Sequence, residues 1–189
     1  MKAAGALLTL DEAHLVVGPD LDAELWGVDV LRVGTLSKTL GSSGGFVAGR
    51  RASIDLLVNR AQSYVFSTAP TPPDSAAALA ALRMLSTPEG ARLRTRLTNH
   101  IGHVAPGHPS PIIPIILGPD ERAQAASTAL RDHGVWVPAL QAPLVPPGTA
   151  RLRVALTAAH TSAHIGLLLD ALAAVPSAPG ETTPGSAPT

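Results

Sequence analysis

Short apolar runs separated by polar turns fill the first third of the chain. Such runs are typical of buried strands in an α/β fold. They predict strands at residues 6–10, 28–33 and 44–49, and a further β-prone segment lies at 64–67. Between the last two, apolar side chains recur at helical spacing, which predicts a helix over residues 51–61.

Helical spacing continues through the middle of the chain, and strands return after it. Helices are predicted over 74–85, where Asp74 and Ser75 would form the cap, and over 89–101. Prolines break the pattern at 106–111. The elements predicted after this break are strands at 112–117, 135–138 and 151–156 and helices at 121–133 and 161–175. This β-α-β-β-α order favours a small α+β unit with an antiparallel sheet.

These patterns divide the chain into four parts. We expect part of a larger α/β domain at 1–73, connecting helices at 74–105 and a small α+β domain at 106–175. Residues 176–189 are rich in Pro, Ser, Thr and Gly, a composition that predicts a disordered tail.

The composition limits the classes of function. Apolar residues make up 46% of the 189 residues, which is enough for a core, and 14 basic residues balance 14 acidic ones. A neutral chain offers no basic surface to nucleic acid or to an anionic membrane. Cysteine is absent, which excludes disulfides, thiolate metal sites and thiol nucleophiles. No run reaches the roughly 20 apolar residues of a membrane span, and we expect a soluble cytoplasmic protein.

Lys38 stands in a turn of small hydroxyl and glycine residues, directly after the strand predicted at 28–33. The only other lysine is Lys2, and arginine fills the remaining Lys and Arg positions. A lysine amine can lose its proton and attack a carbonyl, whereas a guanidinium stays protonated. The turn therefore indicates a nucleophilic amine, with a solvated surface lysine as an alternative of about equal weight.

Asp11-Glu12-Ala13-His14 follows the strand predicted at 6–10. Open α/β sheets place their chemistry at the carboxyl ends of their strands. One class of ATP-hydrolysing helicases carries a similar box, but these enzymes also need a phosphate loop of the form G-x-x-x-x-G-K-[ST]. Arg32 and Ser37 occupy the two glycine positions before Lys38, so the helicase interpretation is rejected.

Histidines offer a second candidate chemistry. His160 and His164 are four residues apart near the start of a predicted helix, a spacing that can hold a metal ion. No cysteine or third ligand stands beside them, so helix capping or solvation is the favoured interpretation and no metal site is predicted. His100, His103 and His108 are interpreted as surface residues.

Pyridoxal phosphate (PLP) requires the groups that the lysine turn and the acidic box offer. Its aldehyde forms an imine with an amine, for which Lys38 is the candidate. Its pyridine nitrogen needs a carboxylate that keeps it protonated, and Asp11 can supply one. Thr35 and Ser37 offer hydroxyls to the phosphate, and His14 can lie by the ring hydroxyl. Because Asp11 and Lys38 follow successive strands, both can face one ligand.

Several segments carry a resemblance to a known family. They are Asp11-Glu12-Ala13-His14, Gly34-Thr35-Leu36-Ser37-Lys38, residues 41–46, Phe66-Ser67-Thr68-Ala69-Pro70, Gly148-Thr149-Ala150-Arg151-Leu152-Arg153 and Leu156-Thr157-Ala158-Ala159-His160. In these segments the chain resembles the α-oxoamine synthases, and within them the branch that acts in biotin synthesis. The resemblance implies a fold-type-I PLP enzyme. This chain would form the back half of its α/β large domain, followed by its small α+β C-terminal domain.

The resemblance also implies roles for single residues. Those that would bind the cofactor are Asp11, His14, Thr35, Ser37, Lys38, Ser67 and Thr68. Among them Asp11, His14 and Lys38 would take part in catalysis, with Lys38 carrying PLP. Ser67 and Thr68 would reach the phosphate of the neighbouring subunit, because the family forms homodimers with active sites at the interface. Arg153 matches the arginine that binds the amino-acid carboxylate.

The implied reaction joins L-alanine to a pimeloyl thioester, carried by coenzyme A or an acyl carrier protein, with loss of carbon dioxide and the thiol. Alanine displaces Lys38 from the cofactor, and the freed amine can then remove the Cα proton. The guanidinium fork of Arg153 suits a carboxylate that must be held in register.

The chain also departs from the family pattern. The resemblance covers only the back half of such an enzyme, the glycine-rich loop after His14 is shortened to 15–19, and Gln141 and Leu144 replace an arginine and a threonine. We therefore expect the chain alone to bind PLP poorly, as a truncated product or as half of a split enzyme with a partner chain. Alternatives are another α-oxoamine synthase, such as glycine C-acetyltransferase, and a non-catalytic dimerisation module.

Overall fold

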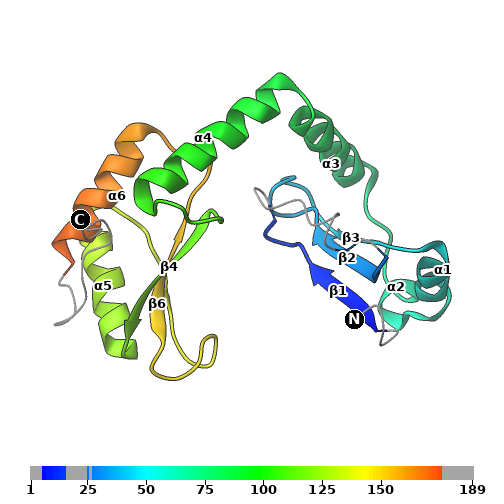
Figure 1. Cartoon of the computed structure of the whole chain (residues 1–189), viewed down its shortest axis with the longest axis horizontal. Helices are drawn as coiled ribbons and strands as arrows, with labels where there is room; N and C mark the ends of the chain where they lie inside the picture. Colours follow the sequence, from blue (N-terminus) through cyan, green and yellow to red (C-terminus); the bar gives the residue numbers. More distant parts are fainter. Residues whose placement is uncertain (1–5, 16–24, 26, 176–189) are drawn as a thin grey trace. The chain divides into compact units, whose positions relative to one another are not determined.

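The computed structural model of the chain describes residues 6–15, 25 and 27–175 (Figure 1). By its internal contacts the chain divides into two compact units, Met1–Ala91 and Arg92–Thr189, which we call unit 1 and unit 2. The tail predicted to be disordered, 176–189, lies outside the described residues.

Unit 1 contains a three-stranded sheet in the order β1-β2-β3. Strand β1 (Leu7–Asp11) runs parallel to β2 (Asp29–Thr35), and β3 (Gly45–Ala48) runs antiparallel to β2 (Figure 1). All three strands were predicted. The prediction that β3 is buried is wrong, because each of its four residues is exposed.

Helices α1 (Arg51–Arg60) and α3 (Pro72–Leu85) follow the sheet, as predicted. The strand predicted at 64–67 is wrong: the chain forms the short helix α2 (Gln62–Val65). The carbonyl of Ala61 accepts the N–H groups of both Tyr64 and Val65, at 3.0 and 2.9 Å, which closes a helical turn in place of an extended segment.

The cap of α3 also differs from the prediction. Thr71 is the N-cap, and its hydroxyl oxygen accepts the N–H of Asp74 at 3.3 Å. Pro72 and Pro73 form the first turn, where a missing N–H donor costs nothing. Asp74 lies inside that turn and accepts the hydroxyl proton of Thr71 at 2.6 Å, so the helix begins two residues before the predicted start.

Helix α4 (Pro88–Val104) begins in unit 1 and continues into unit 2. The other elements of unit 2 are β4 (Ile112–Gly118), α5 (Asp120–Asp132), β5 (Ala139–Leu140), β6 (Ala150–Ala155) and α6 (Ser162–Ala174). The strands form an antiparallel sheet in the order β4-β6-β5, and α5 and α6 flank it (Figure 1). The predicted antiparallel α+β unit is thereby confirmed.

The strand predicted at 135–138 is wrong. The N–H of Val135 donates to the carbonyl of Leu130, and the carbonyl of Val137 accepts the Ser127 hydroxyl at 2.6 Å. These bonds tie most of the segment to α5. Only its last residue, Pro138, contacts β6, where its carbonyl accepts the N–H of Arg153 at 3.0 Å, and the paired strand β5 begins at Ala139.

The buried side chains are distributed unevenly between the units. In unit 2, alternate residues of β6 point inward and pack with one face each of α5 and α6. The core side chains from these elements are Ala123, Ala126, Leu130, Ala150, Leu152, Val154, Ile165, Leu168 and Ala171. In the described part of unit 1 only Ala78 is a buried apolar side chain, while Leu56, Tyr64 and Phe66 are 62, 63 and 83% exposed.

None of the described helices is both long enough and apolar enough to cross a bilayer.

Candidate active site

The acidic box and the lysine turn both follow the sheet of unit 1. Asp11 is the last residue of β1 and pairs in register with Val33 of β2. Lys38 stands three residues after Thr35, the last residue of β2. Because β1 and β2 are parallel neighbours, their carboxyl ends lie side by side at the same end of the sheet. The prediction that Asp11 and Lys38 follow two adjacent strands is confirmed.

Side-chain alternation assigns the residues of this edge to the two faces of the sheet. Successive strand residues point to opposite faces, so Asp11, Val33 and Thr35 share one face. Gly34 points to the other, where the ring of Phe46 covers it: a Cβ on Gly34 would lie 2.4 Å from the Phe46 ring. Glycine is therefore favoured at this position, because a side chain here would have to displace the aromatic ring.

A closed loop holds Lys38 beyond the end of β2. The N–H of Leu36 donates to the carbonyl of Gly44, and the N–H of Ser42 donates to the carbonyl of Leu36. Inside the loop the N–H of Gly41 donates to the carbonyl of Lys38 at 3.1 Å. Gly41 and Gly44 adopt φ values of 59° and 97°, which other residues rarely adopt. The Lys38 side chain is exposed at the tip of this tight turn.

Two hydroxyl groups lie together at the start of the loop. The Thr35 hydroxyl donates to the carbonyl of Gly44 at 3.1 Å, and its oxygen accepts the Ser37 N–H at 3.1 Å. The Ser37 and Thr35 hydroxyl oxygens are 2.7 Å apart. Since the Thr35 proton is directed to Gly44, Ser37 is the donor in this pair. The result is a polar cluster on the residues that precede Lys38.

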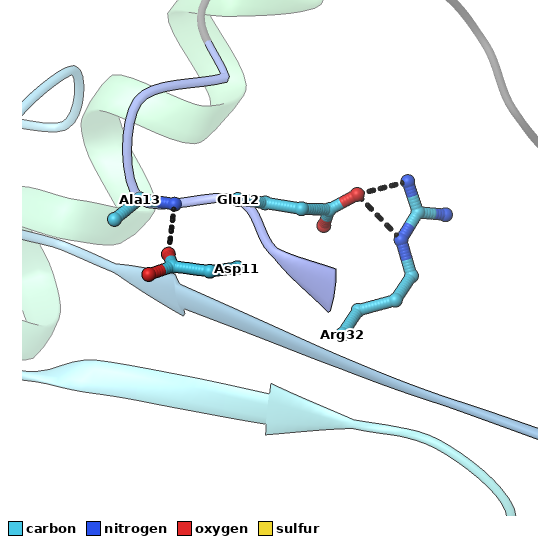
Figure 2. A network of polar contacts seen from close by, with 4 residues as sticks. All are labelled: Asp11, Glu12, Ala13 and Arg32. Atoms are coloured by element: carbon cyan, nitrogen blue, oxygen red, sulfur yellow. Dashed lines mark hydrogen bonds and ion pairs between the residues drawn. The ribbon is translucent and has the colours of Figure 1, made fainter. Parts of the chain in front are cut away.

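The acidic box turns sharply after β1, as Figure 2 shows. The Asp11 carboxylate accepts the N–H of Ala13 at 2.9 Å. The Glu12 carboxylate binds Arg32 of β2, with one oxygen accepting from Nε at 2.9 Å and from a terminal guanidinium nitrogen at 2.6 Å. His14 follows in the same turn and is exposed. Asp11, the proposed ligand of a pyridine nitrogen, is exposed as well.

The remaining predicted site residues lie elsewhere. Ser67 and Thr68 follow α2 in unit 1, and both are exposed. Arg153 belongs to unit 2, on β6, where it alternates with the buried Leu152 and Val154 and so points to the exposed face of that strand. Gln141 and Leu144, which depart from the family pattern, are exposed in the segment after β5.

Two features of the site were missed by the sequence reasoning. The first is the Glu12–Arg32 ion pair, and the second is Ser42, whose hydroxyl donates to the carbonyl of Asp74 at 2.6 Å and ties the lysine loop to α3. Arg32 and Glu12 are 20 residues apart, so only the strand register brings them together.

The histidines of unit 2 have structural roles. His164 and Thr161 form a reciprocal capping box at the start of α6, which confirms the capping interpretation. The pKa of His160 is lowered by burial, and then by the nearby His164 and His100. The interpretation of His100 as a surface residue is wrong: it is 8% exposed, and its Nε2 lies 2.9 Å from the carbonyl oxygen of His160. Within the described ranges no three metal-ligating side chains gather.

Comparison with known proteins identifies the family of this chain. The family model for class I and II aminotransferases matches residues 1–172. The chain belongs to this family. In sequence it is 46% identical over 190 residues to the 8-amino-7-oxononanoate synthase of Anaeromyxobacter dehalogenans strain 2CP-1, an alignment that covers 90% of this chain and 47% of that protein. The chain thus spans about half the length of the curated relatives that it matches.

Solved structures of the class I and II aminotransferase family give the same result for the fold. The structure of SPT (serine palmitoyltransferase) with PLP as an internal aldimine superimposes with a TM-score of 0.80 and 30% identity, over 92% of this chain and 49% of that one. The 8-amino-7-oxononanoate synthase of Francisella tularensis, at 20% identity and a TM-score of 0.67, shares the fold over 89% of this chain and 62% of that one. The predicted α/β fold of the fold-type-I PLP enzymes is confirmed.

Proposed function

We propose that this chain forms the lysine-bearing half of a PLP-dependent α-oxoamine synthase. The proposed reaction condenses L-alanine with a pimeloyl thioester to 8-amino-7-oxononanoate, with loss of carbon dioxide, as a step of biotin biosynthesis. The observation that carries this proposal is the placement of Asp11 and Lys38 at the carboxyl ends of two adjacent parallel strands. The relatives named 8-amino-7-oxononanoate synthase support the choice of substrates.

The chemistry of the residues at this edge fits PLP. An exposed carboxylate on Asp11 suits the protonated pyridine nitrogen, and an exposed amine on Lys38 suits the aldehyde carbon. The hydroxyls of Thr35 and Ser37, with the loop N–H groups near them, are donors of the kind that bind a phosphate. His14 follows Asp11 closely enough to serve the ring hydroxyl. When bound, PLP supplies an electron sink that stabilises a carbanion at the amino-acid Cα.

The chain's own residues would then divide the work. Lys38 would hold the cofactor and take the Cα proton of the amino acid on its amine. Asp11 would keep a proton on the ring nitrogen, because a nearby anion favours the cation. Arg153 binds the carboxylate of the amino acid through its two-pronged guanidinium. Ser67 and Thr68 donate to the cofactor phosphate of a neighbouring subunit in a homodimer.

The proposal includes a requirement for more polypeptide than this chain provides. The chain covers 45–49% of the length of three 8-amino-7-oxononanoate synthases that it matches, and unit 1 exposes apolar side chains on its sheet and helices. We therefore expect the 189-residue chain alone to bind PLP poorly and to be inactive. The remaining half, on the same or a partner chain, would complete the cofactor site.

The experiment uses the two lysines of the chain as variant and control. PLP is added to the chain alone and to the chain mixed with the front half of a relative, followed by borohydride reduction and peptide mapping. We expect a stoichiometric adduct on Lys38 in the mixture, its loss in Lys38→Ala, and its retention in Lys2→Ala. Absence of an adduct in the mixture would refute the function. A full adduct with turnover on the chain alone would refute only the need for a second half.

A second substrate choice deserves a direct comparison, because Gln141 and Leu144 replace an arginine and a threonine of the family pattern. This change favours a different acyl or amino-acid substrate, as in glycine C-acetyltransferase. Titrating the completed enzyme with alanine and with glycine, while following the absorbance of bound PLP, separates the two. A larger and tighter spectral change with glycine would favour the second choice.

A further inference from the structure

Among the described ion pairs of unit 1, the one between Glu12 and Arg32 is the best shielded from water. A single Glu12 oxygen accepts from two guanidinium nitrogens at 2.9 and 2.6 Å, and the Glu12 side chain is only 14% exposed (Figure 2). By comparison, the Arg51–Asp55 pair at 2.8 Å has side chains 90 and 54% exposed, and the Arg50–Asp29 pair at 3.4 Å has side chains 65 and 38% exposed. A charge-assisted contact that is partly shielded from water contributes more than an exposed one.

Both the backbone and the side chain of Glu12 bind strand β2. Its N–H donates to the carbonyl of Val33 at 2.7 Å, which extends the β1–β2 ladder one residue beyond Asp11. Arg32 pairs with Leu10, so side-chain alternation puts Arg32, Leu10 and Glu12 on one face and Asp11 on the other. In Figure 2 the carboxylates of Asp11 and Glu12 accordingly point in different directions.

This arrangement connects the ion pair to Asp11 through one peptide. The peptide that joins Glu12 to Ala13 carries the N–H that donates to the Asp11 carboxylate at 2.9 Å. If the Glu12 side chain loses Arg32, its partly buried carboxylate gains by turning toward water, because an ion without its counter-charge is costly to keep desolvated. The anchor of the Glu12 side chain on β2 is then lost, so the Glu12–Ala13 peptide is less constrained and its N–H separates from the Asp11 carboxylate more often.

We propose that Glu12 and Arg32 are positioning residues, which fix the Asp11 carboxylate from the opposite face of the sheet. Arg32 also neutralises the charge of Glu12, so that no unpaired negative charge lies beside the Asp11 carboxylate. The role in cofactor binding rests on the proposed function, in which Asp11 receives the pyridine nitrogen of PLP.

Amide hydrogen exchange in the full chain tests the positioning directly. In Arg32→Met we expect exchange at Ala13 and Glu12 to become about tenfold faster, as for loss of one charge-assisted contact. Arg32→Lys, which retains the charge with fewer donors, should lie between Met and the wild type. The exchanged pair Glu12→Arg/Arg32→Glu should return toward the wild-type rate. Arg50→Met, the matched control, removes the partner of Asp29 at the start of β2 and should leave both amides unchanged.

Two outcomes would overturn the positioning role. One is an unchanged exchange rate at Ala13 in Arg32→Met. The other is an equal acceleration along all of β2, which would mean that Arg32 merely stabilises the sheet.

The link to the cofactor is tested with the completed enzyme. We expect Arg32→Met to weaken PLP binding about tenfold and the exchanged pair to recover most of the loss, while Arg50→Met binds as the wild type does. If the wild type itself forms no adduct on Lys38, the proposed function fails and the exchange result stands independently. If the wild type forms the adduct and Arg32→Met binds PLP equally well, the inference is overturned.

Discussion

Two glycines of helix α4 should respond in opposite ways to the same substitution. Gly90 lies in the first turn, and a Cβ there would meet the Met84 carbonyl oxygen at 2.5 Å and the Leu85 Cα at 2.6 Å. These are backbone atoms at the end of α3, which cannot rotate away as a side chain can. A Cβ on Gly102, near the other end of α4, would meet nothing within 4 Å.

The magnitudes follow from two opposing effects. Alanine is favoured over glycine in a helix interior by about 1 kcal/mol, and this gain is smaller near helix ends. Overpacking typically costs roughly 1–3 kcal/mol, and immovable backbone neighbours place Gly90 at the upper end. We expect Gly90→Ala to destabilise the chain by about 1–2 kcal/mol and Gly102→Ala to stabilise it by about 0.5 kcal/mol.

Urea unfolding, followed by the far-ultraviolet circular dichroism of the helices, measures both variants against the wild type. Gly102→Ala is the matched control, since it makes the same chemical change in the same helix. If Gly90→Ala is as stable as the wild type or more so, α3 and α4 do not approach as closely as described. The double variant should show the sum of the two effects, because the sites share no neighbour.

Three further outcomes are expected. Gly34→Ala should destabilise unit 1 by about 1–2 kcal/mol, because the added Cβ collides with the Phe46 ring. Adding Phe46→Ala to this variant should recover most of the lost stability in thermal unfolding. If the double variant recovers none of it, the contact between Gly34 and Phe46 is contradicted. Leu152→Ala, at a fully buried position, should cost roughly 2–5 kcal/mol in urea unfolding, whereas Leu144→Ala, 75% exposed, should change stability by less than about 0.5 kcal/mol. Because the pKa of His160 is lowered from 6.5 in the folded state, its contribution to stability is complete above that pH and declines as the pH falls below it. His160→Asn should flatten this part of the pH profile of the melting temperature, and an unchanged profile would assign the dependence to other groups.

The elements with a regular apolar period were predictable from the sequence. Strands at 6–10, 112–117 and 151–156 and the helix at 161–175 were found within one or two residues. The apolar period arises because one face of each strand or helix is turned toward a core. In unit 2 the side chains of that core belong to the chain itself. The antiparallel sheet could be inferred from the β-α-β-β-α order of the elements.

The errors have two different origins. Tyr64 and Val65 are good strand formers, but a local helical turn, closed by the Ala61 carbonyl, outweighs this preference. His100 belongs to the arginine-rich helix α4, and its burial depends on a contact with the carbonyl of His160, which is 60 residues away in the sequence. This second contact cannot be inferred from residues close in sequence.

The sequence predicted the positions of the candidate site residues, but not the contacts that hold them in place. Asp11 and Lys38 could be placed at neighbouring strand ends, because an apolar run followed by a functional group marks the carboxyl end of a strand. The contact between Glu12 and Arg32 depends on a register of β1 against β2 that the amino-acid pattern alone does not specify. The anchoring of Ser42 to Asp74 likewise requires the position of α3.

The uneven distribution of interior side chains has a consequence for the order in which the two units open. Among the described residues, almost the entire apolar interior belongs to unit 2. Few buried apolar contacts lower the free energy of local opening, so a protease should cut unit 1 under conditions in which unit 2 stays intact.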